Sequence, residues 1–313
     1  MSTPPLRILF AGSGEFGLPT LNALLDAGHQ VVQVYSQPDR PAGRGRNLTP
    51  TPIARFAIDR SLPLIRTENL NLESLSPADL LVVIAFGQKI SDTVANHCRL
   101  GSVNLHASLL PKYRGAAPIH WAILRGETIT GNSVIRLAQR MDAGAILGQS
   151  TLPIDPLETT GELHDRLAND GAPLVHRIAQ ALEEGTCAET TQDESQSTMA
   201  PKLSRDTAKI DWTQPAEVVA RHIRGLSPWP GCRVRLLGLH GDEVAKLTLF
   251  RARVTQPRAE EPGDIGYEGQ VGCGKYTAIE VLELQPDGKR RMSLADFKNA
   301  RDWGLGTRLE SIS

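Results

Sequence analysis

The sequence predicts an α/β fold in which a Rossmann-like, mainly parallel sheet domain is followed by a smaller, OB-like β-barrel domain. Two observations favour the sheet. Apolar runs of strand length alternate with helical patterns, beginning with residues 6–11 and the leucine-rich segment 18–25. Residues 80–85 are apolar throughout, as in a parallel strand covered on both faces. Towards the C-terminus, short strand patterns separated by glycine and proline turns are typical of a small barrel.

Length and composition agree with two domains. A chain of 313 residues is long enough for each domain to bury its own core. Its 34 basic and 35 acidic side chains create no global field that would attract nucleic acid. The four cysteines lie far apart in the sequence, so neither a zinc site nor a disulfide framework is indicated. Without a targeting segment or a membrane-spanning apolar run, we expect a soluble, cytoplasmic protein.

The first strand leads into a glycine-rich turn at Gly12, Gly14 and Gly17 and then into a helix. The next strand, at 30–35, is followed by Asp39, where a dinucleotide-binding fold keeps the acid that contacts the ribose. A dinucleotide-dependent enzyme is therefore an alternative. Against it, an arginine-, glycine- and proline-rich segment follows Asp39 directly, and a single glycine fingerprint is a frequent false positive.

This basic segment, residues 38–52, carries Arg40, Arg44 and Arg46, and Asp39 is its only acid. We predict a loop that does not pack against the domain. Such a charge run is either a solvated loop or an arm that binds phosphates, since planar guanidinium groups grip phosphate oxygens in pairs. The residues themselves leave both interpretations open.

A helix at 53–59 and a strand at 62–65 precede the buried strand at 80–85. The residues at the carboxyl end of that strand lie where open α/β sheets bind their ligands. These are Phe86, Gly87 and Gln88.

The strand at 103–106 carries two polar side chains. Asn104 and His106 are two residues apart and therefore point to one face of the strand. The following run, Ser108, Leu109, Leu110 and Pro111, is apolar but ends in proline, so it should end the strand and line a ligand groove. A second polar turn, residues 141–144, follows a strand pattern at 133–136, and we expect its Asp142 to meet His106.

The later elements follow the same rules. Thr159 and Glu162 form a predicted capping box for a helix that Pro173 should kink. The apolar pattern collapses at 185–204, which indicates a connection between domains. A helix after Pro215 and strands at 234–237, 245–254, 277–284 and 291–293 then build the barrel. The predicted organisation is a domain at 1–188, a linker at 189–206 and a C-terminal domain at 207–313.

Asn104, His106, the run 108–118 and Asp142 together resemble the signature of the folate-dependent formyltransferase family. The chain is most similar to the members that formylate methionyl-tRNA, and the resemblance continues at 228–231 and 284–292, so it covers nearly the whole sequence. It departs at Ser13 and Gly14, where the family usually has Thr-Pro, and at Ala145, where an acid or proline is frequent.

The resemblance implies the activity, the substrates and the site. The activity is formyl transfer from 10-formyltetrahydrofolate to the α-amine of initiator methionyl-tRNA during translation initiation. We expect no metal, no membrane association and a monomer. The implied catalytic residues are Asn104, His106 and Asp142, those that bind the folate are Phe86, Gly87, Gln88, Ser108, Leu109, Leu110 and Pro111, and those that bind tRNA are Arg40, Arg44, Arg46 and Lys202.

This chemistry suits the residue types. Formyl transfer to an amine develops an oxyanion, for which Asn104 and His106 are suitable hydrogen-bond donors. Asp142 can relay the proton from the incoming amine to the folate nitrogen and can orient His106. An aminosugar-nucleotide formyltransferase is the first alternative, and the arginine-rich loop argues against it. A non-catalytic folate- or tRNA-binding protein is disfavoured by the complete polar set.

Overall fold

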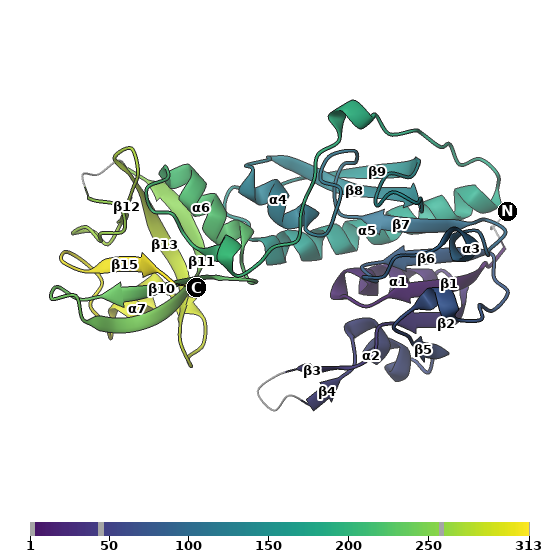
Figure 1. Cartoon of the computed structure of the whole chain (residues 1–313), viewed down its shortest axis with the longest axis horizontal. Coiled ribbons are helices and arrows are strands. Elements are labelled where there is room, and N and C mark those ends of the chain that lie inside the picture. Colours follow the sequence, from purple (N-terminus) through teal and green to yellow (C-terminus); the bar gives the residue numbers. More distant parts are fainter. Residues whose placement is uncertain (1–3, 43–46, 257–259, 313) are drawn as a thin grey trace. The chain divides into compact units, whose positions relative to one another are not determined.

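The computed structural model describes residues 4–42, 47–256 and 260–312 and divides into two compact bodies (Figure 1). The N-terminal body comprises Met1–Gly115, Thr130–Leu152 and His164–Met199, and the C-terminal body comprises Ala116–Ile129, Pro153–Leu163 and Ala200–Ser313. Two segments that precede residue 188 thus group with the C-terminal body. The predicted domain boundaries stay a prediction. In the described part of the chain, no helix combines the length and apolarity needed to cross a membrane.

The N-terminal body is built on a seven-stranded sheet with the order β5-β2-β1-β6-β7-β8-β9. The strands are β1 (Arg7–Gly12), β2 (Gln30–Ser36), β5 (Leu64–Arg66), β6 (Leu80–Ile84), β7 (Ser102–His106), β8 (Ile129–Arg136) and β9 (Ile146–Pro153). From β5 to β7 the neighbouring strands are parallel, whereas β8 pairs antiparallel with β7. The mainly parallel sheet is confirmed. All of β6 is buried, which accounts for its unbroken apolar sequence.

Helices pack against this sheet. They are α1 (Leu18–Asp26), α2 (Pro52–Asp59), α3 (Asp92–Ala95) and the long α5 (Thr160–Glu183). Asn132 Nδ2 of β8 donates to the Leu167 carbonyl of α5 at 2.9 Å, and a Cβ at Gly171 would meet the Leu105 side chain of β7 at 2.5 Å. The predicted capping box is present, since Thr159 N donates to Glu162 Oε2 at 2.9 Å. The helix continues past Pro173 to its end.

The segment at 38–52 is not a loop throughout, although its described strand residues are exposed, as expected for a segment that does not pack against the domain. Two short antiparallel strands, β3 (Arg40–Ala42) and β4 (Asn47–Thr49), pair there as a hairpin, with Arg40 opposite Thr49. Backbone pairing satisfies peptide groups even where side chains stay exposed, which a composition-based interpretation does not capture. Arg44 and Arg46 lie outside the described residues.

The C-terminal body is a barrel, as predicted. Its strands β10 (Cys232–Leu237), β11 (Glu243–Thr255), β12 (Val271–Cys273), β13 (Thr277–Pro286), β14 (Met292–Ser293) and β15 (Arg308–Ser311) form one antiparallel sheet with the edges β12 and β15. Bridges from Asp264 to Arg308 and from Ile265 to Val271 connect the two edges, so the barrel is nearly closed. The sequence did not predict β12 and β15, because strands of three and four residues are too short to show a clear alternation of apolar and polar side chains.

Helices complete this body. They are α4 (Pro118–Leu124), α6 (Ala216–Gly225) and α7 (Leu294–Lys298). Val219 and Ile223 of α6 join the buried core of the barrel strands, and Trp121 of α4 packs against the same core. Val218 of the same helix is exposed.

A histidine pair in the N-terminal body, in which His29 is buried, predicts a pH-dependent stability. The Leu6 amide donates to His29 Nδ1 at 3.0 Å, so His29 carries its hydrogen on Nε2, which lies 3.2 Å from His176 Nδ1. Burial, and secondarily His176, lowers the pKa of His29. The folded protein therefore binds fewer protons than the unfolded chain, whose histidine pKa is about 6.5, and stability should fall as the pH drops below that value.

When the pH is lowered from about 8 to about 5, we expect the melting temperature of the His29→Gln variant to decrease by less than that of the parent protein. Glutamine can still accept the Leu6 hydrogen bond but cannot be protonated. Thermal unfolding followed by circular dichroism at each pH measures this. His240→Gln, which alters an exposed histidine, serves as the control. Parallel pH curves for both variants and the parent would refute the assignment.

Candidate active site

Asn104 and His106 lie on β7, which is flanked by β6 and β8. Asn104 is opposite Val83 of β6 and Ile135 of β8, and His106 is opposite Ser133 of β8. His106 is 7% exposed, whereas Asn104 is partly accessible. The side-chain amide of Asn104 forms no hydrogen bond with any other residue that the structure describes. The Asn104 donors are therefore available to a ligand.

The imidazole of His106 is held between two oxygen atoms. Its Nε2 lies 2.9 Å from the Tyr113 carbonyl, and because a carbonyl only accepts, Nε2 carries the hydrogen in this contact. Nδ1 faces Asp142 Oδ2 at 3.7 Å. This separation is too long for a direct hydrogen bond, yet it is short enough for both atoms to contact one small polar group. The structure thus brings together the two turns from which the sequence predicts the site.

The turn that carries Asp142 is closely packed. Asp142 has a φ of 56°, in the left-handed region, and its Oδ2 accepts a hydrogen bond of 2.8 Å from the Gly115 amide. At Gly144 a Cβ would lie 1.9 Å from the Arg136 carbonyl at the end of β8, so only glycine fits there. The carboxylate direction is set by these backbone contacts.

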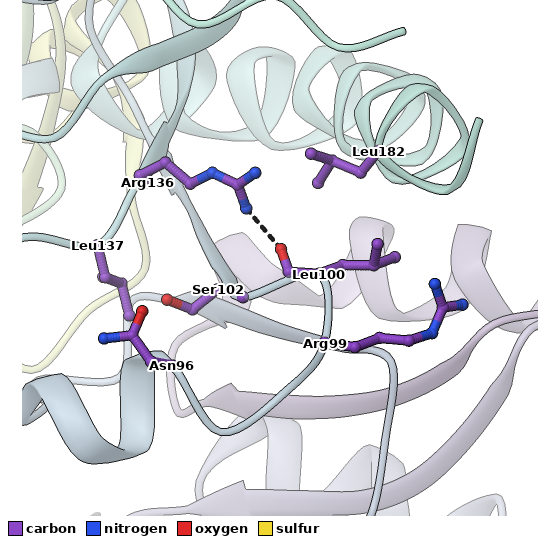
Figure 2. Close-up of a pocket in the computed structure, with 8 residues that line it drawn as sticks. Asn96, Arg99, Leu100, Ser102, Arg136, Leu137 and Leu182 are labelled. Atoms are coloured by element: carbon purple, nitrogen blue, oxygen red, sulfur yellow. Dashed lines mark hydrogen bonds between the residues drawn. The ribbon is translucent and has the colours of Figure 1, made fainter. Parts of the chain in front are cut away.

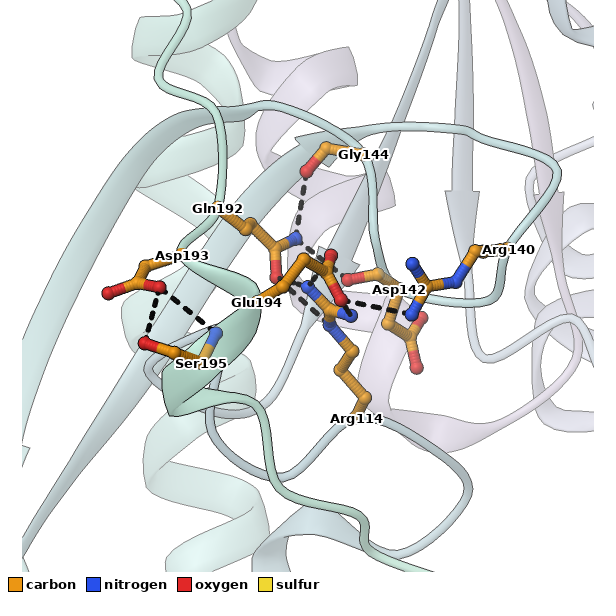
Figure 3. A network of polar contacts seen from close by, with 8 residues as sticks. All are labelled: Arg114, Arg140, Asp142, Gly144, Gln192, Asp193, Glu194 and Ser195. Atoms are coloured by element: carbon orange, nitrogen blue, oxygen red, sulfur yellow. Dashed lines mark hydrogen bonds and ion pairs between the residues drawn. The ribbon is translucent and has the colours of Figure 1, made fainter.

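A polar network lies behind this turn (Figure 3). The buried Arg114 donates to Gln192 and Glu194, and Gln192 donates in turn to the carbonyls of Asp142 and Gly144. Hydrogen bonds from Arg114 first, and from Arg140, lower the pKa of Glu194. Sequence reasoning missed Gln192 and Glu194, because polar residues in a segment without an apolar pattern suggest a linker. The one available signal was Arg114, a charged residue in the loop that follows the candidate strand.

The residues predicted to line a folate groove divide into two roles. The Ser108 hydroxyl donates to the Lys112 carbonyl at 2.6 Å, and the Leu110 amide donates to the Ser133 hydroxyl at 3.0 Å. These contacts hold the loop, which includes a cis peptide bond between Leu110 and Pro111, against β8. Of the two leucines, Leu109 is partly exposed and Leu110 is buried. Leu109 therefore offers the apolar surface.

Phe86, Gly87 and Gln88 follow β6 at the same sheet edge, since β6 and β7 are parallel. Phe86 is buried. The amide of Gln88 is engaged, because its Oε1 accepts from the Leu70 amide at 2.8 Å and its Nε2 donates to the Thr67 carbonyl at 2.7 Å. Gly87, with a φ of 77°, is exposed. Of these three positions, Gly87 is the one that is exposed.

The predicted tRNA-binding residues that the structure describes are Arg40 and Lys202. Arg40 Nη2 donates to Gln37 Oε1 at 2.7 Å, and Lys202 is exposed. Asp39, the acid of the dinucleotide alternative, pairs instead with Arg66 Nε at 3.2 Å. This ion pair argues against a role for Asp39 as a ribose ligand.

A cavity of about 410 Å³ opens near Ser102, at the other end of β7 from His106 (Figure 2). Two arginines line it. Arg99 pairs with Asp79 and Glu183, and Arg136 pairs with Glu189 and donates to the Leu100 carbonyl at 2.6 Å. The guanidinium charges are thus already compensated. Across the described ranges, no group of three or more His, Cys, Asp or Glu side chains is arranged to hold a metal ion.

Comparisons with known proteins identify the family of the chain. The family model described as formyl transferase matches residues 6–178, and formyl transferase, C-terminal domain, matches residues 202–302. The methionyl-tRNA formyltransferase of Methylococcus capsulatus is 42% identical over 306 residues, which cover 94% of this chain and 97% of that protein. That of Pseudomonas fluorescens strain SBW25 is 41% identical over an alignment of 324 residues, which covers 99% of each chain.

Solved structures share the fold. An N-formyltransferase from Helicobacter canadensis, in complex with folinic acid and dTDP-3-aminofucose, superposes with a TM-score of 0.67 at 16% identity, over 90% of this chain and 99% of that one. HypX from Aquifex aeolicus in complex with tetrahydrofolic acid superposes with a TM-score of 0.62 at 17% identity, over 94% of this chain and 47% of that one. Given both family models and relatives about 40% identical over nearly their whole length, the chain belongs to the methionyl-tRNA formyltransferase family.

Proposed function

We propose that this protein transfers the formyl group of 10-formyltetrahydrofolate to the α-amine of initiator methionyl-tRNA. The observation that carries the proposal is the arrangement of Asn104, His106 and Asp142 at the carboxyl edge of the sheet, with His106 Nδ1 3.7 Å from Asp142 Oδ2. The near full-length relatives named methionyl-tRNA formyltransferase support the same acceptor.

The sheet edge suits a folate-derived donor, which supplies an activated formyl carbon. Gly87 presents backbone groups, Leu109 presents apolar surface and Asn104 has unpaired polar atoms, a combination that fits a flat ring with a polar edge. Solved relatives of the same fold were crystallised with tetrahydrofolic acid and folinic acid. The 10-formyl form is the one in which the carbon would be ready for transfer.

The space between His106 and Asp142 suits the incoming amine. Nδ1 of His106 is an acceptor when Nε2 donates to the Tyr113 carbonyl, and Asp142 Oδ2 is an acceptor when ionised. An amine placed between them donates one N–H to each, and its lone pair then points towards the formyl carbon. Holding the reactants in this orientation removes much of the entropic barrier to their reaction.

Asn104 Nδ2 then donates to the oxyanion that develops on the formyl oxygen. As the new N–C bond forms, the amine loses a proton to the Asp142 carboxylate, and that proton passes to the folate nitrogen as its bond to the formyl carbon breaks. In this scheme His106 orients the incoming amine by accepting one of its N–H groups at Nδ1. The sequence-based expectation of a second oxyanion donor at His106 is revised, because its Nε2 already binds the Tyr113 carbonyl.

The direct test is incubation with 10-formyltetrahydrofolate and methionyl-tRNA, with an aminosugar nucleotide as the competing acceptor. We expect formyl-methionyl-tRNA as the product and no formylated sugar. Exclusive formylation of the sugar nucleotide would overturn the proposed acceptor while keeping the chemistry.

We further propose that the basic segment with Arg40, Arg44 and Arg46, together with Lys202, binds tRNA phosphates. The Arg44→Ala variant should raise the KM for methionyl-tRNA about tenfold or more, since a hydrogen bond to a charged group contributes about 1.5–3 kcal/mol. The KM for the folate should be unchanged. Losing one phosphate contact should also reduce the salt dependence of tRNA binding, by about 0.7–0.9 in the slope of log K against log salt.

Steady-state kinetics with each substrate varied, and binding titrations at several salt concentrations, measure these effects. Arg177→Ala removes an exposed arginine of α5 and is the matched control. Equal changes in both KM values, or the same effect in the control, would contradict the role of the basic segment.

The proposal also includes a cytoplasmic location and a monomeric state. Its domain division is a catalytic domain at 1–188, a linker at 189–206 and a C-terminal domain at 207–313. The tRNA substrate supports the location, because aminoacylated initiator tRNA is used where translation starts. Size-exclusion chromatography with light scattering tests the monomer.

A further inference from the structure

We propose that Gln192 and Arg114 are positioning residues that hold Asp142 in front of His106. The inference rests on the proposed function, in which the Asp142 carboxylate takes the proton of the amine. It assigns a task to the segment around residue 192, which the sequence suggests is only a linker.

The backbone conformation of the Asp142 turn depends on hydrogen bonds from residues outside the turn. A φ of 56° is unfavourable for a residue with a side chain, so surrounding contacts must hold the backbone there. Gln192 supplies two of them. Its Nε2 donates to the Asp142 carbonyl at 2.7 Å and to the Gly144 carbonyl at 2.8 Å, so both hydrogens of the amide bind the turn (Figure 3). Gln192 is 6% exposed, which shields these bonds from competing water.

Arg114 sets the orientation of this amide. A guanidinium group only donates, so the oxygen of Gln192 must face Arg114 and the nitrogen must face the turn. Gln192 Oε1 lies 3.0 Å from Arg114 Nε and 2.7 Å from Nη2. Glu194 Oε1, 2.9 Å from Nη2, compensates the buried charge. The alternative rotamer of the amide would place two donors against one another.

The backbone around Arg114 controls both partners of the candidate pair. The residue before it, Tyr113, provides the carbonyl that binds His106 Nε2, and the residue after it, Gly115, provides the amide that binds Asp142 Oδ2. Anchoring the buried Arg114 side chain therefore fixes the imidazole, the carboxylate and, through Gln192, the turn that carries the carboxylate.

The Gln192→Glu variant tests this role. Glutamate keeps the length and the acceptor for Arg114, but it presents an oxygen where the two carbonyls need a donor. We expect kcat to fall about 10- to 100-fold, as for a catalytic group displaced by about 1 Å, with both KM values within about twofold of the parent. Gln192→Met, which adds no charge, should act in the same direction. Gln196→Glu, the same change at an exposed glutamine of this segment, is the control and should keep parental kinetics.

Two comparisons separate positioning from general damage. In an Asp142→Asn background, Gln192→Glu should reduce kcat no further, because the group that it positions is already lost. The NMR chemical shifts of the His106 ring in the free protein should move in the same direction in Gln192→Met as in Asp142→Asn. This readout needs no substrate, so it remains decisive if methionyl-tRNA proves not to be the acceptor. Unchanged kcat in both Gln192 variants, additive losses, or unaltered His106 chemical shifts in Gln192→Met would each overturn the proposal.

Discussion

The Asp142→Asn variant should lose formyl transfer by about 10²–10⁴ in kcat, the range that general acid–base groups contribute. Asparagine preserves the shape of the side chain, and its oxygen can still accept the hydrogen bond from the Gly115 amide. It cannot accept the proton of the amine. Because neither the apolar surface at Leu109 nor the backbone at Gly87 changes, folate binding should persist.

Single-turnover kinetics with methionyl-tRNA and a fluorescence titration with the folate separate these two effects. The chain offers a matched control in Asp165, which contacts His164 Nδ1 at 2.9 Å but is largely exposed. Asp165→Asn removes the carboxylate of an Asp–His pair outside the candidate site and should leave kcat unchanged. An Asp142→Asn enzyme with near-parental turnover would remove the proton-transfer step from the mechanism.

The Asn104→Ala variant should lower kcat by about 10²–10³, which corresponds to the 2.7–4 kcal/mol typical for removal of one oxyanion donor. The physical reason lies in its surroundings. His106 is committed to the Tyr113 carbonyl through Nε2, whereas the Asn104 amide binds no other side chain or backbone group in the described residues. Asn104 is therefore the group that remains to meet the developing negative charge.

The KM for both substrates should change little, because this bond strengthens only in the transition state. Asn96→Ala, at an exposed asparagine whose side chain donates to the Asp92 carbonyl, is the control. If Asn104→Ala raised KM and left kcat intact, Asn104 would bind the ground state and the oxyanion assignment would fail.

Several features were predictable because they are local. The apolar run of β6 is determined by burial on both faces, and the capping box of Thr159 and Glu162 spans one turn of a helix. The alternation in β7 placed Asn104 and His106 on one face, since strand geometry has a period of two residues. The motif around these residues also indicated the family, which the comparisons confirm.

The sequence by itself determined the α/β class, the mainly parallel sheet, the barrel and the strand that carries the candidate site. Only the tertiary structure decided which atoms of that site are already occupied: His106 Nε2 by the Tyr113 carbonyl, the Gln88 amide by Thr67 and Leu70, and the Asp142 turn by Gln192. The reason is physical. Periodicity and caps depend on neighbours within a few residues, whereas a buried polar group takes its partner from whichever distant segment the folded chain brings within hydrogen-bond reach.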